Sequence, residues 1–206
     1  MNASAQDELS RLRAIAEEGR SAPLLGGWHL ILWGGAMTLA LLINWAVVER
    51  VLLWPGWSLA ISWFGIVLVA WTASMLVGRS KANEPGARSV GNRVERAAWT
   101  TAGYFLLMLS LALFVRASLG DGDRADWDLF AFMPPATFGA YAVALHASAV
   151  AAGGGSGRLY VPVALAFVGL TAFLIGDPLQ YLAAAAGIFL VSIPAGLGHL
   201  KAARRA

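Results

Sequence analysis

Cysteine is absent from this 206-residue chain, and charged residues are few. Without a thiol, the chain can form no disulfide, no thiolate metal site and no cysteine nucleophile. Its residues are 13% charged and 58% hydrophobic, whereas soluble domains carry roughly 25% charged residues. So few charges would leave large apolar patches on a water-soluble surface, which soluble monomers avoid. The composition therefore predicts a protein whose solvent is a lipid bilayer.

A secretory signal peptide is also missing from the first 26 residues, which contain neither a long apolar core nor a cleavage site. Residues 6–19 instead place apolar side chains at three-to-four spacing, with Gly19 as a stop signal. We therefore interpret residues 1–26 as a cytoplasmic amphipathic segment with a short helix that rests on the headgroups or on the protein's own loops. A docking helix for a cytosolic partner is the alternative.

Six apolar runs follow, each close to the roughly 17–25 residues that span a bilayer as a helix. They lie at 28–48, 57–77, 97–115, 129–150, 159–176 and 178–199, and the fifth is the shortest. None shows the period-two alternation of a barrel strand, and lipid offers the backbone no partners outside a helix. We predict an all-α fold, a six-transmembrane-helix bundle over residues 27–199, followed by a basic cytoplasmic tail at 200–206.

The longest polar connection, residues 79–96, is predicted to be a cytoplasmic loop that presents basic side chains to a partner. These are Arg79, Lys81, Arg88, Arg93 and Arg96. If the chain threads back and forth, twelve of its fifteen basic residues fall on the side of this loop, and Lys and Arg are enriched on the cytoplasmic side. We therefore expect both termini in the cytoplasm and a place in the cell (inner) membrane. Basic residues that flank apolar runs act as topology signals, so no nucleic-acid site is predicted.

Small residues recur at the spacing that lets membrane helices approach closely. The pairs are Gly34 with Thr38, Ala140 with Ala144, and Ala183 with Gly187. Gly27, Gly34 and Gly35 would give the first helix one smooth face, used for packing within the monomer or, alternatively, in a homodimer. Three deeply placed tryptophans are predicted to pack between helices: Trp33, Trp63 and Trp71.

No Asp, Glu, Lys or Arg falls well inside the six runs. A charge near the bilayer centre costs about 3 kcal/mol or more and usually marks an ion or proton path. Its absence argues against an ion-coupled carrier and against a voltage sensor. Three histidines remain as candidate ligands for haem or a transition metal, all in the cytoplasmic half: His29, His146 and His199. Separate histidines bonded to carbonyls or water are the alternative. Because His146 is set deepest, its replacement is expected to matter more than that of His199.

Catalytic motifs are not found. Residues 154–157 match the GxSG motif of rhomboid proteases, but this serine lies in a loop, and glycine–serine flexibility explains the segment. The acidic run DGDRADWD at 121–128 lacks the closing glutamate of a calcium loop, so no metal site is predicted. The sequence favours a non-catalytic integral membrane protein that acts as an accessory, regulatory or sensor component through its cytoplasmic face. The alternatives are a small channel or carrier for a neutral solute, and a haem or quinone redox protein.

Overall fold

The computed structural model describes residues 6–8, 10, 24–81, 84, 86–119, 128–153 and 156–205. Over these residues it is all-α, without strands, which confirms the predicted fold class. The α-helices are α2 (Gly27–Val48), α3 (Trp57–Lys81), α4 (Val90–Leu119), α6 (Met133–Ala151), α7 (Tyr160–Phe173) and α8 (Leu179–Ala203). Two 3-10 helices, η1 (Leu129–Phe132) and η2 (Ser156–Leu159), lead into α6 and α7. In the described part of the chain, five helical segments are long and apolar enough to cross a membrane, whereas α7 has 14 residues.

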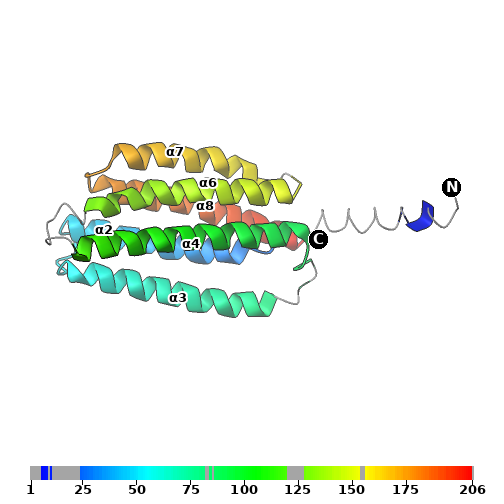
Figure 1. The fold of residues 1–206 in the computed structure, drawn as a ribbon, viewed down its shortest axis with the longest axis horizontal. Coiled ribbons are helices and arrows are strands. Elements are labelled where there is room, and N and C mark those ends of the chain that lie inside the picture. Colours follow the sequence, from blue (N-terminus) through cyan, green and yellow to red (C-terminus); the bar gives the residue numbers. More distant parts are fainter. Residues whose placement is uncertain are drawn as a thin grey trace.

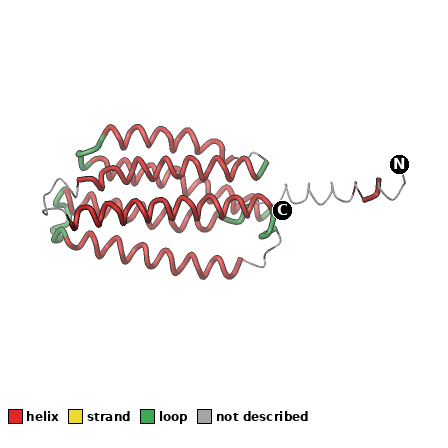
Figure 2. The backbone as a smooth tube through the Cα atoms, in the orientation of Figure 1, coloured by secondary structure: helices red, strands yellow, loops and turns green. Residues whose placement is uncertain are grey.

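The helices lie side by side and alternate in direction along the chain (Figure 1). The starts of α2, α4 and α7 therefore meet the ends of α3, α6 and α8 at one end of the bundle, close to the C-terminus. We call this the basic end, and the opposite end the far end. Loops and turns of the described chain lie at both ends of the bundle (Figure 2).

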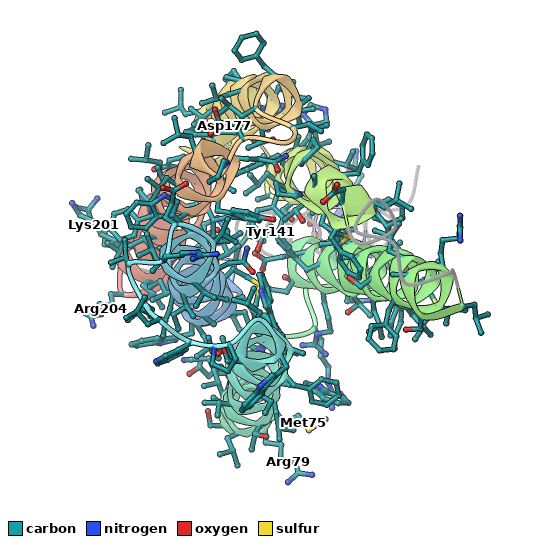
Figure 3. The ribbon with its side chains drawn as sticks, turned by 90° about the vertical axis from the view of Figure 1, so that its left-hand side faces the viewer. Met75, Arg79, Tyr141, Asp177, Lys201 and Arg204 are labelled. Atoms are coloured by element: carbon teal, nitrogen blue, oxygen red, sulfur yellow. The ribbon has the colours of Figure 1, made fainter. Side chains whose placement is uncertain are left out.

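Each helix packs mainly against its neighbours in the order α3–α2–α8–α7–α6–α4. The core between α6, α7 and α8 is filled by large side chains with little or no exposure, among them Phe138, Leu145, Ile188 and Val191. Phe138 stacks on Phe167 of α7 with ring centroids 5.3 Å apart. Trp99 of α4 meets Tyr141 of α6 edge-on at 4.9 Å, and Tyr141 points into the middle of the bundle (Figure 3).

Glycine lets α2 approach α8 more closely than any other residue would. A Cβ on Gly34 would lie 2.5 Å from Cβ of Ser192, and one on Gly27 would lie 2.6 Å from the carbonyl oxygen of Gly196. Both distances are too short for real atoms, so the smooth face predicted on this helix is used inside the monomer. Gly35 does not belong to that face, because a Cβ there would meet nothing within 4 Å.

Two of the three deep tryptophans pack between α2 and α3, as predicted. The indole N–H of Trp33 donates to Oγ of Ser74 at 3.3 Å, and that of Trp63 donates to Oδ1 of Asn44 at 3.2 Å. Trp71 was predicted wrongly, because its side chain is 56% exposed on the outer surface of α3. Most of the predicted amphipathic helix at 6–19 lies outside the described residues, as do residues 120–127 and 154–155.

The connection predicted as a loop over 79–96 is shorter than expected. Helix α3 continues through Lys81 and α4 begins at Val90, so Arg79 and Lys81 end one helix while Arg93 and Arg96 start the next. The prediction rested on charge, but the spacing of Asn92, Glu95, Trp99 and Ala102 puts them on one helical face. That face turns inward, and Glu95 is 3% exposed.

Candidate functional site

Glu95 is the buried ionisable residue around which the basic end is assembled. Its Oε2 accepts a hydrogen bond from the backbone N–H of Gly26, just before α2, at 3.1 Å. Its Oε1 lies 3.4 Å from Nδ1 of His199 in α8. A carboxylate from α4 thus meets the positive end of the α2 dipole, where negative charge is stabilised, and joins α2, α4 and α8 at one point.

The close fit around Glu95 depends on glycine at the start of α2. A Cβ on Gly26 would lie 2.5 Å from Oε1 of Glu95, so any larger residue would displace the carboxylate. Gly27 lies against both Gly196 and Cβ of His199. The consecutive glycines therefore allow the carboxylate and the imidazole to reach the first backbone groups of the helix.

Asn92, one turn before Glu95, joins the connection between α3 and α4 to the start of α2. Its Oδ1 accepts from the N–H of Leu25 at 2.7 Å, and its Nδ2 donates to the carbonyl of Gly86 at 3.0 Å. Gly86 has a positive φ of 78°, a conformation that glycine adopts without strain. The two polar residues of α4 thus satisfy backbone groups that would otherwise be left unpaired at the start of α2.

The structure brings two of the three candidate histidines together. His29 of α2 is half-buried, lies against the backbone of Ser74 in α3, and is close enough to Glu95 and Arg96 for their charges to interact. His199 faces Glu95 from α8. His146 is apart from both, with an exposed side chain on α6.

These positions do not assemble a metal-ligand set. Among the described residues, no group of three or more His, Cys, Asp or Glu side chains could hold a metal ion. What remains is a pair of buried atoms, Oε1 of Glu95 and Nδ1 of His199, which make no hydrogen bond to the described chain. A buried polar atom without a hydrogen bond is costly, so these two atoms, 3.4 Å apart, are the unsatisfied polar contact of the site. The haem hypothesis for His29, His146 and His199 stays a prediction.

The basic residues predicted as a partner surface form part of a larger cationic cluster at the basic end. Its exposed members come from several segments: Arg79, Arg88, Arg93, Arg96, Arg158, Lys201, Arg204 and Arg205. Lys81 is partly buried and pairs with Glu84. Within residues 24–205, the two described acids at this end, Glu84 and Glu95, are therefore both engaged with other groups of the protein.

Sequence reasoning missed Glu95 and Asn92, because both were placed in a loop. The available signal was their three-residue spacing, which continues into the apolar positions Trp99 and Ala102. It also missed Gln180 at the far end, whose buried Nε2 donates to the carbonyls of Ala131 at 2.7 Å and Thr171 at 2.8 Å. Gln180 lies two residues after Pro178, in the first turn of α8, and nothing in the local sequence indicates that its side chain is buried and bonded to two backbone carbonyls.

Comparison with known proteins provides no family for this arrangement: no family model matches the chain, and no curated protein and no solved structure is significantly similar to it.

Proposed function

We propose that the chain is a non-catalytic multi-pass protein of the cell membrane that acts as an accessory, regulatory or sensor component through its basic end. The observation that carries the proposal is the concentration of exposed cationic side chains at that end. Arg88 and Arg93 lie on and just after the connection between α3 and α4, where a partner outside the lipid can reach them. An acidic segment of another protein is the complementary surface.

The cytoplasmic placement of both termini is part of this proposal. Of the described basic residues, nine lie at the basic end and two, Arg50 and Arg116, at the far end. Lys and Arg are retained on the cytoplasmic side during insertion. The basic end is therefore proposed to face the cytoplasm of the cell.

The filled core favours this role over the alternative of a channel. Phe138 and Val191 are 0% exposed, and Leu145 and Ile188 are nearly so, at the centre of α6 and α8. A static pore needs a continuous polar passage, whereas these side chains pack as in a protein interior. The packed bundle thus supports an accessory, regulatory or sensor component that acts through the surface of its basic end.

Site-specific photo-crosslinking in whole cells tests the proposal. A crosslinking residue replaces Val90 or Leu119, the exposed first and last residues of α4. We expect discrete cross-linked proteins from position 90, which disappear in Arg88→Gln/Arg93→Gln but persist in Arg88→Lys/Arg93→Lys, because charge is retained in the latter. The same species from position 119, or none from position 90, would contradict a partner at the basic end.

A further inference from the structure

Helices α2 and α8 bring opposite helix termini together at the basic end. They are antiparallel neighbours that pack closely, so the start of α2 lies beside the end of α8 (Figure 1). A helix start carries partial positive charge and a helix end carries partial negative charge. Glu95 lies at the start of α2, and His199 lies one turn from the last residue of α8. A carboxylate and an imidazolium would therefore each lie near the terminus that stabilises their charge.

The contact between Glu95 and His199 is buried, but it is not a hydrogen bond. Oε1 and Nδ1 lie 3.4 Å apart, in side chains that are 4% and 10% exposed. Neither atom bonds to another group of the described chain. A charge-assisted N–H···O bond measures about 2.7–2.9 Å, so the two atoms would have to approach by about 0.5 Å to form one. A small rotation of either side chain is enough to close that distance.

The protonation state of His199 decides whether this bond forms. Histidine is the side chain whose charge ordinarily changes between about pH 5 and pH 8. The neutral ring has one N–H and one acceptor nitrogen, whereas the charged ring donates from both nitrogens, and an ionised carboxylate only accepts. Only the charged ring therefore always presents a donor to Oε1. The resulting bond joins opposite charges, and such bonds are about twice as strong as neutral ones.

The remaining charged groups around His199 are cations with exposed side chains. Besides Glu95, the titratable and charged groups at this end of the surrounding elements are His29 on α2, Arg93 and Arg96 on α4, His146 on α6, Arg158 on η2, Tyr160 on α7, and Lys201 and Arg204 on α8 itself. The arginines and the lysine are exposed, so water and salt screen their repulsion of a further cation, whereas the attraction of the buried Glu95 is screened less. His29 is close enough to Glu95 for their charges to interact, so its contribution has to be separated from that of His199.

We propose that Glu95 and His199 form a pH-dependent clasp between α8 and the starts of α2 and α4. On the acidic side of neutrality, the protonated imidazole donates to Oε1 and holds the end of α8 in place. As the pH rises, the imidazole loses its charge, the bond is lost, and the last turn of α8 is held less firmly. The stability that the clasp contributes is therefore present at the lower pH and lost at the higher pH. The clasp goes beyond the function proposed above, because it operates without a partner.

Thermal melting of the purified full-length protein in detergent tests the clasp. Between about pH 8 and about pH 6, we expect the melting temperature of the parent to rise by about 3 °C more than that of His199→Asn. Asparagine keeps a polar atom near the position of Nδ1 but does not titrate. Glu95→Gln keeps an oxygen for the N–H of Gly26, yet its melting temperature should rise as little as that of His199→Asn. The double variant should lose no more of the rise than either single variant.

Two further histidine variants control for the other imidazoles. His146→Asn removes an exposed imidazole on α6, and His29→Asn removes the one within electrostatic range of Glu95. Both variants should keep the rise in melting temperature that the parent shows. An equal rise in the parent and in His199→Asn would overturn the proposal, whichever of the other variants alters it.

Hydrogen–deuterium exchange of the last turn of α8 locates the effect. Parent and His199→Asn are compared with each other at each pH, so the intrinsic pH dependence of exchange cancels. We expect the amides of residues 200–203 to be protected in the parent, relative to the variant, about fivefold more at about pH 6 than at about pH 8. The same relative protection at both pH values would overturn the proposal even if the melting temperatures differ, because the proton would then not hold the end of α8.

Discussion

Glu95 caps a helix to which it does not belong. The first N–H groups of a helix have no partner within it, and the usual solution is a side chain at the N-cap. At the start of α2 the N-cap residue is Gly26, which has no side chain to offer. Glu95 supplies the oxygen from α4 instead, so one residue stabilises α2 and fixes its position relative to α4.

Replacing Glu95 should therefore loosen the basic end. We expect Glu95→Ala to destabilise the protein by about 2 kcal/mol, because the N–H of Gly26 loses its hydrogen-bond acceptor and is left unsatisfied. Thermal melting in detergent measures the loss, with Glu49→Ala, an exposed acid at the far end, as the control. A melting temperature lowered no more by Glu95→Ala than by Glu49→Ala would show that the contact is dispensable.

Replacing His199 should cost more stability than replacing His146. This is the reverse of the order predicted from the sequence, in which His146 was placed deepest in its membrane-spanning run. The side chain of His199 is 10% exposed and faces Glu95, whereas that of His146 is exposed. We expect His199→Ala to cost about 1–3 kcal/mol, as for a buried polar group that loses its partner, and His146→Ala to stay within about 0.5 kcal/mol of the parent. Chemical denaturation of both variants in mixed micelles compares them, and a larger loss for His146→Ala would restore the original order.

Helix boundaries could be predicted from the sequence where local backbone chemistry sets them. Pro134 and Pro135 occupy the first turn of α6, where proline loses no hydrogen bond. The carboxylate of Asp177, directly before Pro178, accepts a hydrogen bond from the N–H of Leu179 at 2.8 Å at the start of α8, which is the usual role of Asp at a helix start. The start of α4 could not be predicted in this way, because Val90–Arg96 is polar and its helix is stabilised by burial of Asn92 and Glu95 against another segment.

The contact between α2 and α8 depends on which of the two adjacent glycines, Gly34 or Gly35, faces α8. We expect Gly34→Ala to destabilise the protein by about 1–3 kcal/mol, because its Cβ would overlap Ser192 and force the helices apart. Gly35→Ala, one residue away, should be neutral or stabilise by about 0.5–1 kcal/mol, since alanine favours the helix and the space is open. The sequence could predict small residues for this helix, but not which of the two adjacent glycines packs.

Thermal melting of the two alanine variants in the same detergent distinguishes them. The pair is matched, because both residues are helical neighbours that gain one methyl group. Similar melting temperatures for Gly34→Ala and Gly35→Ala would mean that α2 and α8 are not in close contact at this level.

At the scale of the molecule, the order of the helices depends on a few polar and small contacts rather than on hydropathy. The hydroxyl of Thr38 donates to the carbonyl of Ala185 at 3.4 Å between α2 and α8, and Gln180 joins α8 to η1 and α7. All six apolar runs are similarly hydrophobic. Hydropathy therefore predicts that they span the membrane, but it does not predict which helices pack against each other. That α3 packs mainly against α2 and α4 mainly against α6 could not be predicted from the sequence.

Threading of the bundle through the membrane follows from where its charges lie, and α4 allows a direct test. Its first and last residues, Val90 and Leu119, are 66% and 82% exposed, and they lie at opposite ends of the bundle (Figure 1). Because the chain has no cysteine, Val90→Cys and Leu119→Cys each introduce a single thiol without any background. Both substitutions replace an exposed apolar residue, so neither should disturb the fold.

In intact cells, a membrane-impermeant maleimide should label Leu119→Cys and spare Val90→Cys, because the basic end is retained in the cytoplasm. Lysed cells should give labelling at both positions, which controls for accessibility. The converse pattern would place the basic end outside, and would remove the support that Arg88 and Arg93 give to a cytoplasmic partner.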